Sequence, residues 1–123
     1  MVVFEHDPGT LRSMFVSGGI GFLHDMLDIA GGEDVFGDVK RESVQPSMET
    51  LISRAPEVIV EIRGTLPSNI EAERRAWLTL TTVPAVKNGR VHFLAGEYLV
   101  VPGPRVAQGV EAFARTLHPD AYR

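Results

Sequence analysis

The stretch "SGGIGFLHDMLDIAGG", residues 17–32, is the first candidate for chemistry, because its glycines precede an amphipathic run. Backbone N–H groups at the start of a helix can bind a phosphate. Gly19 and Gly21 fit the first two positions of G-x-G-x-x-G, but His24 stands at the third, where a small residue lets helix and strand pack closely. No Gly-Lys-Ser or Gly-Lys-Thr occurs in the chain. Two interpretations of these glycines remain. They either form a loop that needs backbone angles open to glycine alone, or they form a wall that a ligand can approach closely.

The histidines and carboxylates show no catalytic or metal-binding spacing. His6, His24, His92 and His118 lie far apart, without an H-x-x-x-H or H-E-x-x-H pattern. His24 and Asp28 are one helical turn apart, a spacing that a metal can use, although solvated surface is the favoured interpretation. There is no Gly-x-Ser-x-Gly elbow, and no carboxylate pair is placed by its spacing as acid and base. We therefore expect no enzyme, no metal site and no cofactor.

Three other residues are candidates for recognition. Glu49 follows a Ser47 N-cap, where the helix dipole stabilises a carboxylate; exposed on a rigid first turn, it also suits an arginine of another protein. Arg63 ends the strongest strand pattern, where parallel sheets usually bind ligands, but a surface residue at a strand end is an equal alternative. Tyr98 is a loop aromatic before a helix, so it either lines a cleft or is partly buried.

Hydrophobic periodicity predicts the elements that must position these residues. Strands are expected at 2–5, 14–16, 57–62 and 90–94, and helices at 19–30, 48–55, 69–77 and 104–117. Gly31-Gly32 and Pro56 end the first two helices, and Trp77 is expected to anchor the charged third helix. Ser68-Asn69-Ile70-Glu71 reads as a capping box, 33–46 as a loop, and "VPAV" as a lead into a Lys87-Asn88-Gly89 turn.

This alternation of strands and helices predicts an α/β fold, a three-layer sandwich around a largely parallel central sheet. The length of 123 residues suits one domain, and we take 1–123 as a single α/β lobe. The net charge of −4 and the scattered Lys and Arg argue against nucleic acid. No apolar stretch is long enough to span a membrane, no secretion signal is evident, and the lack of cysteine excludes disulfides.

Three stretches in order resemble the C-terminal lobe of ABC-importer substrate-binding proteins. They are "GGIGFLHDMLDIAGGEDVF", "VQPSMETLISRAPEVIVEI" and "VPAVKNGRVHFLAGEYLVVPGPRV", followed by an amphipathic helix. The family in question joins two lobes by one long helix and carries cobalamin, haem or ferric siderophores. The resemblance implies a non-enzymatic receptor in the periplasm, or otherwise outside the cytoplasm, which clamps a metal chelate between its lobes and delivers it to a membrane permease.

The resemblance also implies roles for particular residues. Glu49 matches the C-lobe glutamate that docks on permease arginines. The ligand-facing loops of the family carry over to Phe15, Ser17, Gly18, Gly19, Ser43, Tyr98 and Leu99, with Arg63 as a weaker candidate. The opening glycines are then expected to shape one wall of the cleft. Because the N-terminal lobe and the linking helix of the family are absent from this chain, we expect weak ligand binding and self-association, most simply as a two-fold dimer.

Two alternative functions stay open on the sequence alone. One is a stand-alone α/β nucleotide- or small-molecule-binding domain, or an enzyme, built on the turn at 17–21. The other is an interaction module that kept the fold of the lobe and lost transport. Neither the identity of the chelate nor the oligomeric state follows from the residues.

Overall fold

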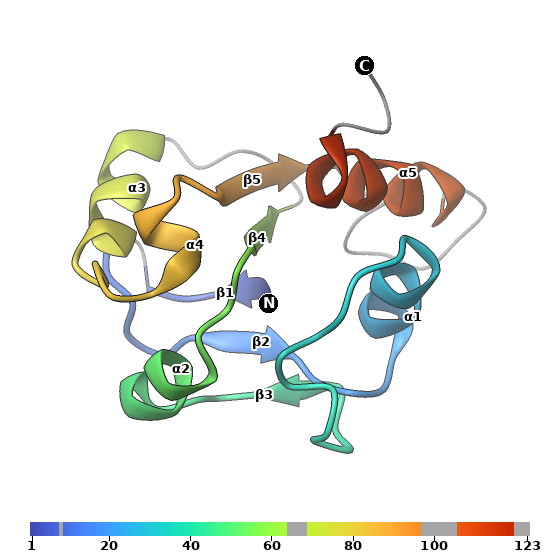
Figure 1. Ribbon diagram of the computed structural model, residues 1–123, viewed down its shortest axis with the longest axis horizontal. Helices are drawn as coiled ribbons and strands as arrows, with labels where there is room; N and C mark the ends of the chain where they lie inside the picture. The colour runs from blue at the N-terminus through green and yellow to red at the C-terminus, as the bar shows by residue number, and fades with distance from the viewer. Residues whose placement is uncertain (8, 64–68, 97–105, 120–123) are drawn as a thin grey trace.

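A computed structural model describes residues 1–7, 9–63, 69–96 and 106–119. Strands and helices alternate along this part of the chain, as Figure 1 shows. In chain order the elements are β1 (Val2–Glu5), β2 (Phe15–Ser17), α1 (Phe22–Ile29), β3 (Ser43–Val44), α2 (Met48–Arg54), β4 (Ile59–Arg63), α3 (Ile70–Leu78), α4 (Pro84–Lys87), β5 (Val91–Ala95) and α5 (Val106–Leu117).

The five described strands form one sheet in the order β3-β2-β1-β4-β5. Strands β1, β4 and β5 are parallel neighbours, whereas β2 pairs antiparallel with both β1 and β3. The α/β class is therefore confirmed, with a mixed sheet. The antiparallel step arises because residues 6–14 are too few for the crossover of a dozen or more residues that a parallel connection needs.

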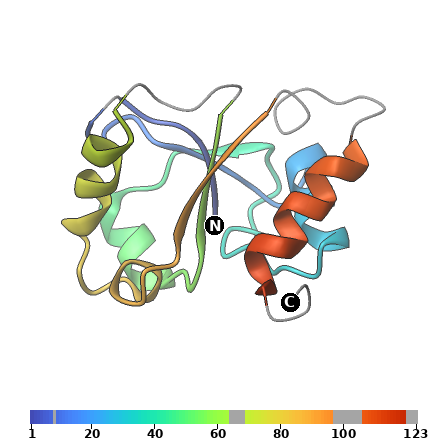
Figure 2. The same cartoon turned by 90° about the horizontal axis from the view of Figure 1, so that it is seen from above.

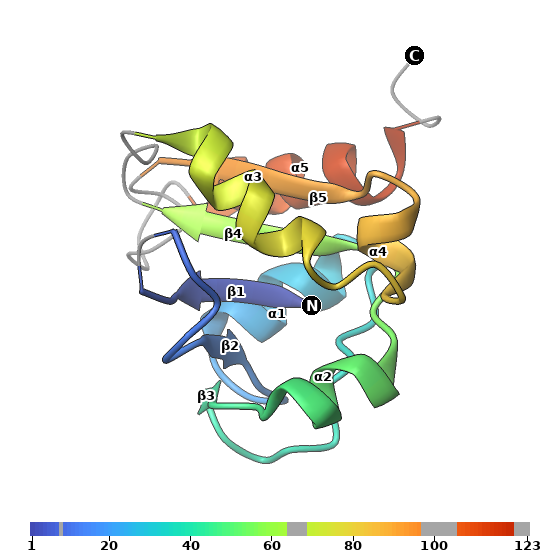
Figure 3. The same cartoon turned by 90° about the vertical axis from the view of Figure 1, so that its left-hand side faces the viewer.

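Helices cover both faces of the sheet and give the three expected layers. Figure 2 shows α1 and α5 on one side of the strands and α2, α3 and α4 on the other, and Figure 3 looks onto the latter group. Because side chains alternate along a strand, Val60 and Ile62 of β4 pack toward α1 and α5. Ile59 packs into the opposite core with Leu51 of α2 and Trp77 of α3. Trp77 is 1% exposed, which confirms it as a packing anchor.

The ends of the helices follow local sequence signals. Ser47 caps α2, its hydroxyl accepting a hydrogen bond from the N–H of Thr50 at 3.1 Å. Asn69 caps α3; Ser68, the other part of the expected capping box, lies outside the described residues. Gly31, with φ 84°, ends α1 as predicted.

Three expectations about the elements were wrong in detail. Helix α1 begins at Phe22 rather than at residue 19, because its N-cap Gly21 has a φ of 102° that a helix cannot contain. Ser43–Val44 pairs with β2, although this segment was expected to be loop. "VPAV" forms α4, since Pro84 sits in its first turn, where a proline needs no N–H partner.

The C-terminal helix α5 presents an apolar face to the sheet. Phe113 is completely buried against Val60 and Ile62, while Val110 and Leu117 are partly buried beside it. Residues 102–104, the Pro-Gly-Pro stretch expected to lead into this helix, lie outside the described part of the chain. In the described segments no helix has the length and apolar character required to cross a membrane.

Candidate functional site

The opening glycines lie against the segment 37–42. A Cβ added at Gly18 or Gly19 would come within 2.1 or 2.2 Å of a backbone carbonyl oxygen of that segment, so larger residues do not fit. Their own N–H groups donate to the segment, Gly18 to the carbonyl of Glu42 at 3.1 Å and Gly19 to that of Val39 at 2.8 Å. These two N–H groups are therefore already hydrogen-bonded. The glycines hold a wall in place rather than forming a phosphate cradle.

A cavity of about 290 Å³ opens on this wall at the β2–β3 end of the sheet. Two of the expected ligand-facing residues, Ser17 and Ser43, are cross-strand partners and both line it. Ser43 is exposed, whereas the side chain of Ser17 is completely buried. The other lining residues are Phe4, Ile20, Gly21, Phe22, Leu23 and Glu42. Ile20 is 45% exposed, so this wall presents apolar surface to solvent.

Phe15 and Arg63 reach the same region through Phe4. The rings of Phe4 and Phe15 lie 6.4 Å apart between centroids. Arg63, at the end of β4, donates from Nη1 to the carbonyl of Phe4 at 3.0 Å and from Nη2 to Glu61 at 3.1 Å. Its side chain remains 22% exposed. Phe15 and Arg63 thus contact Phe4, which lines the cavity with Ser17 and Ser43, but neither Phe15 nor Arg63 lines the cavity itself. Tyr98 and Leu99 lie outside the described residues.

Larger cavities occur elsewhere in the described chain. One of about 580 Å³ lies between the loop after β1 and helices α2 and α3, and another of about 450 Å³ is lined by residues near Gly31 and Arg90. Neither contains a residue that the sequence marked for ligand contact. The smaller cavity is therefore the better candidate, because two expected residues and exposed apolar surface line it, although Gly18 and Gly19 themselves do not.

Glu49 occupies the first turn of α2, where it is exposed. With the residues that the structure describes, its side chain makes no hydrogen bond or ion pair. The helix beneath it is firmly held: Leu51 is completely buried, and Arg54 donates to the carbonyl of Val35 at 2.6 Å and pairs with Asp38. The pKa of Asp38 is lowered by that hydrogen bond from Arg54. Glu49 is thus a free carboxylate on a fixed helix.

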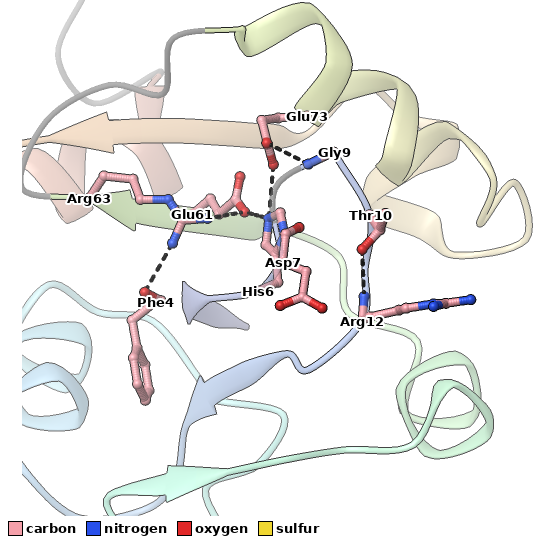
Figure 4. A network of polar contacts seen from close by, with 9 residues as sticks. All are labelled: Phe4, His6, Asp7, Gly9, Thr10, Arg12, Glu61, Arg63 and Glu73. Carbon is pink, nitrogen blue, oxygen red and sulfur yellow. Dashed lines mark hydrogen bonds and ion pairs between the residues drawn. The ribbon is translucent and has the colours of Figure 1, made fainter.

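A second polar group, formed by His6, Glu61 and Glu73, is buried behind Arg63 (Figure 4). His6 Nε2 pairs with Glu61 Oε1 and lies 3.2 Å from Glu73 Oε2. The ring of His6 also stands edge-on to Trp77, with centroids 6.3 Å apart. Burial alone would lower the pKa of His6, but the hydrogen bond to Glu61, the contact with the Asp7 carbonyl and the charges of both glutamates raise it above its ordinary value.

Sequence reasoning missed this group. His6, Glu61 and Glu73 are far apart in the chain, and only the fold brings one ligand atom from each within 4.8 Å of the others. Glu61 carried a signal, because a charged residue inside an otherwise apolar central strand requires a partner. Glu73 carried none: it stands in a run of charges expected to face solvent but is 5% exposed. His24 lies 4.0 Å from Asp34, and Asp28 is exposed, in keeping with the solvated surface favoured for this pair.

The chain is similar to known proteins in sequence and in fold. Residues 1–98 match the family described as "Periplasmic binding protein". A substrate-binding lipoprotein of an ABC transporter in Bacillus subtilis (strain 168), named YvrC and itself uncharacterized, is 26% identical over 110 residues, which cover 89% of this chain and 33% of the relative.

Solved structures share the fold at low sequence identity. The ABC-type Fe³⁺-hydroxamate transport system from Saccharomonospora viridis DSM 43017 superposes with a TM-score of 0.78 and 20% identity over 95% of this chain and 40% of that one. The periplasmic haem-binding protein RhuT from Roseiflexus sp. RS-1, in its apo form, gives 0.75 and 23% over 98% and 46%. The chain therefore spans a third to a half of the length of these proteins.

Proposed function

Because this chain belongs to the periplasmic binding protein family, we propose that it supplies one wall of a metal-chelate cleft in the substrate-binding component of an ABC importer. The observation that carries the proposal is the cavity at the β2–β3 end of the sheet, where Ser17 and Ser43 meet exposed Ile20. In this role the chain binds and presents a ligand and performs no chemistry on it.

The lining of the cavity supports a particular chemical class of ligand. Phe4, Ile20, Phe22 and Leu23 provide apolar contact, and Ser43 adds a hydroxyl. This combination suits a ligand with both apolar and hydrogen-bonding surface, such as a ferric hydroxamate siderophore, haem or cobalamin. Its volume of about 290 Å³ is at the lower limit of ordinary ligand pockets, as expected for a wall that meets a second wall across the ligand.

The test measures binding of ferrioxamine B, haemin and cyanocobalamin to the chain by equilibrium dialysis. We expect one of the three to bind weakly and saturably. Ile20→Ser should then weaken binding about tenfold, because an apolar side chain is lost from the wall. Ile29→Ser is the matched control, since Ile29 is 72% exposed on α1 and does not line the cavity. Equal loss in both variants, or binding of none of the probes, would refute the proposal.

Glu49 is proposed as the contact with the permease. Its exposed carboxylate on a capped helix is suited to an arginine of a partner, where an ion pair mainly speeds association and fixes orientation. Glu49→Gln should slow association with the paired permease in lipid nanodiscs and reduce the dependence of the rate on salt. Glu57→Gln, at an exposed glutamate before β4, should leave both unchanged. Equal rates for wild type and Glu49→Gln would remove Glu49 from this role.

We also propose that the chain acts outside the cytoplasm, as the name of its lipoprotein relative suggests, and that it self-associates through apolar surface. Ile20, Ile29, Ile52 and Leu78 are large apolar residues that are exposed in the described chain. Sedimentation velocity over a wide concentration range should show a concentration-dependent dimer. A single monomer species throughout that range would rule this out.

A further inference from the structure

His6, Glu61 and Glu73 bring three potential metal ligands together from three separate parts of the fold. His6 follows β1, Glu61 lies in β4 and Glu73 lies in α3 (Figure 4). Their side chains are 0%, 0% and 6% exposed, respectively. One donor atom from each lies within 4.8 Å of the other two. None of the three lines the proposed ligand cavity, so this group is distinct from the cargo site.

The orientation of the His6 ring places Nε2, a potential metal-ligand atom, toward the two carboxylates. Its Nδ1 lies 2.8 Å from the carbonyl oxygen of Asp7, which can only accept a hydrogen bond. Nδ1 therefore carries a proton, and Nε2 faces Glu61 and Glu73, where it either carries a second proton or offers its lone pair to a metal ion. This is the arrangement in which a histidine usually holds a metal, with the far nitrogen fixed by a carbonyl. Either way, a positive charge must lie between Nε2 and the two carboxylates, supplied by the second ring proton or by a metal ion.

Each of the two carboxylates accepts a hydrogen bond at Oε1 and leaves Oε2 available to a metal ion. Arg63 donates to Oε1 of Glu61 at 3.1 Å, and the N–H of Gly9 donates to Oε1 of Glu73 at 2.8 Å. Oε2 of Glu61 is buried without a polar partner among the described residues, and Oε2 of Glu73 meets only His6 Nε2 there. Buried polar atoms without partners are rare in folded proteins, and an ion is one of the few explanations.

We propose that His6, Glu61 and Glu73 bind one divalent transition-metal ion, with Zn²⁺ as the best match. His6 Nε2 and Glu73 Oε2 are 3.2 Å apart, close to the roughly 3.3 Å edge of a tetrahedron with Zn–ligand bonds near 2.0–2.1 Å. The imidazole nitrogen favours a transition metal over Mg²⁺ or Ca²⁺, which prefer oxygen ligands alone. Two glutamates balance the charge of the ion, while Arg63 remains partly solvated.

Such an ion would join three separate segments of the fold. It would tie the loop after β1 to the middle of β4 and to the first turn of α3. It would also fix Glu61, which in turn holds Arg63 at the strand ends near Phe4. The predicted effect is a stiffer scaffold behind the cavity, and it requires no cargo to be bound.

The test uses untagged chain stripped of metal with a chelator and titrated with ZnCl₂ at neutral pH by isothermal calorimetry. We expect one ion per chain and a Tm several degrees higher with Zn²⁺. His6→Gln and Glu73→Gln should each weaken binding at least about 100-fold, since either change removes a ligand. His118→Gln, at an exposed histidine away from the group, should bind as the wild type does. Should the first two variants fold poorly, X-ray absorption of the Zn²⁺-loaded wild type gives a second measurement.

Two results would overturn the proposal. The first is Zn²⁺ binding that is absent from the wild type or equal in wild type and His6→Gln, which would leave a proton on His6 as the cation of the group. The second is an absorption spectrum without a nitrogen ligand. Because free Zn²⁺ is the probe, a failure here leaves the chelate-binding proposal untouched, and a failure of chelate binding leaves this one untouched.

Discussion

The guanidinium of Arg63 joins the ends of two neighbouring parallel strands, donating to the carbonyl of Phe4 at 3.0 Å while Glu61 holds its other nitrogen at 3.1 Å. Phe4 also packs against Phe15 and lines the cavity that contains Ser43. Phe4 therefore connects the guanidinium of Arg63 with the apolar residues of the candidate site. The contribution of these contacts to stability can be measured directly.

Replacing Arg63 should lower the stability of the whole fold as well as loosen the ends of β1 and β4. Arg63→Gln removes the cation beside the buried Glu61, and we expect the free energy of unfolding to fall by about 2 kcal/mol. Urea denaturation measures the change. Lys87→Gln is the control, because the side chain of Lys87 is exposed and makes no hydrogen bond or ion pair with the described residues, so the change should cost about 0.5 kcal/mol or less. Equal losses in the two variants would mean that the Arg63 contacts add little.

The close approach of the glycine wall gives a second prediction. Gly18→Ala places a Cβ against a backbone carbonyl, which cannot move without displacing the segment 37–42, so we expect a loss of about 3 kcal/mol. Gly89→Ala meets no atom within 4 Å and costs only its left-handed backbone angle, about 1 kcal/mol. If Gly18→Ala unfolds in urea no earlier than Gly89→Ala, the segment 37–42 can move to make room for the added Cβ.

Much of this architecture was predictable because its signals are local. The strand at Val2–Glu5 and the cap at Ser47 depend on a few adjacent residues, and both were located correctly. β3 was missed because a strand of two residues carries no periodicity; it exists only through its pairing with β2. The burial of Glu73 was missed for the same reason, since its partners Gly9 and His6 are distant in sequence.

Removing the cap of α2 tests how firmly Glu49 is presented. Ser47→Ala deletes the acceptor of the Thr50 N–H and should lower the free energy of unfolding by about 1 kcal/mol. Ser53→Ala removes a hydroxyl whose one hydrogen bond with the described residues goes to the Thr50 carbonyl of the same helix, and it should have almost no effect. Both are read by urea denaturation. A neutral Ser47→Ala would show that packing of Leu51, rather than the cap, holds the helix.

His92 makes stability depend on pH. Burial lowers its pKa, and the nearby charges of Arg90 and Arg74 lower it further. The unfolded chain, with an ordinary pKa near 6.5, therefore binds this proton more readily than the folded one. The stability contribution is complete above about pH 6.5 and is lost as pH falls through the folded-state pKa. Urea denaturation at several pH values should show less acid destabilisation in His92→Gln than in wild type or His118→Gln. A larger acid loss in His92→Gln would contradict the sign.

The measurement that most directly tests the central claim, that the β2–β3 end of the sheet is a ligand wall, is amide NMR of the chain titrated with ferrioxamine B, haemin or cyanocobalamin. We expect the probe that binds to perturb amides at residues 4, 15–23 and 42–43, around the cavity that Ser17 and Ser43 line. Perturbations centred on the larger cavity at residues 9–14 and 76–80, or none with any probe, would contradict it.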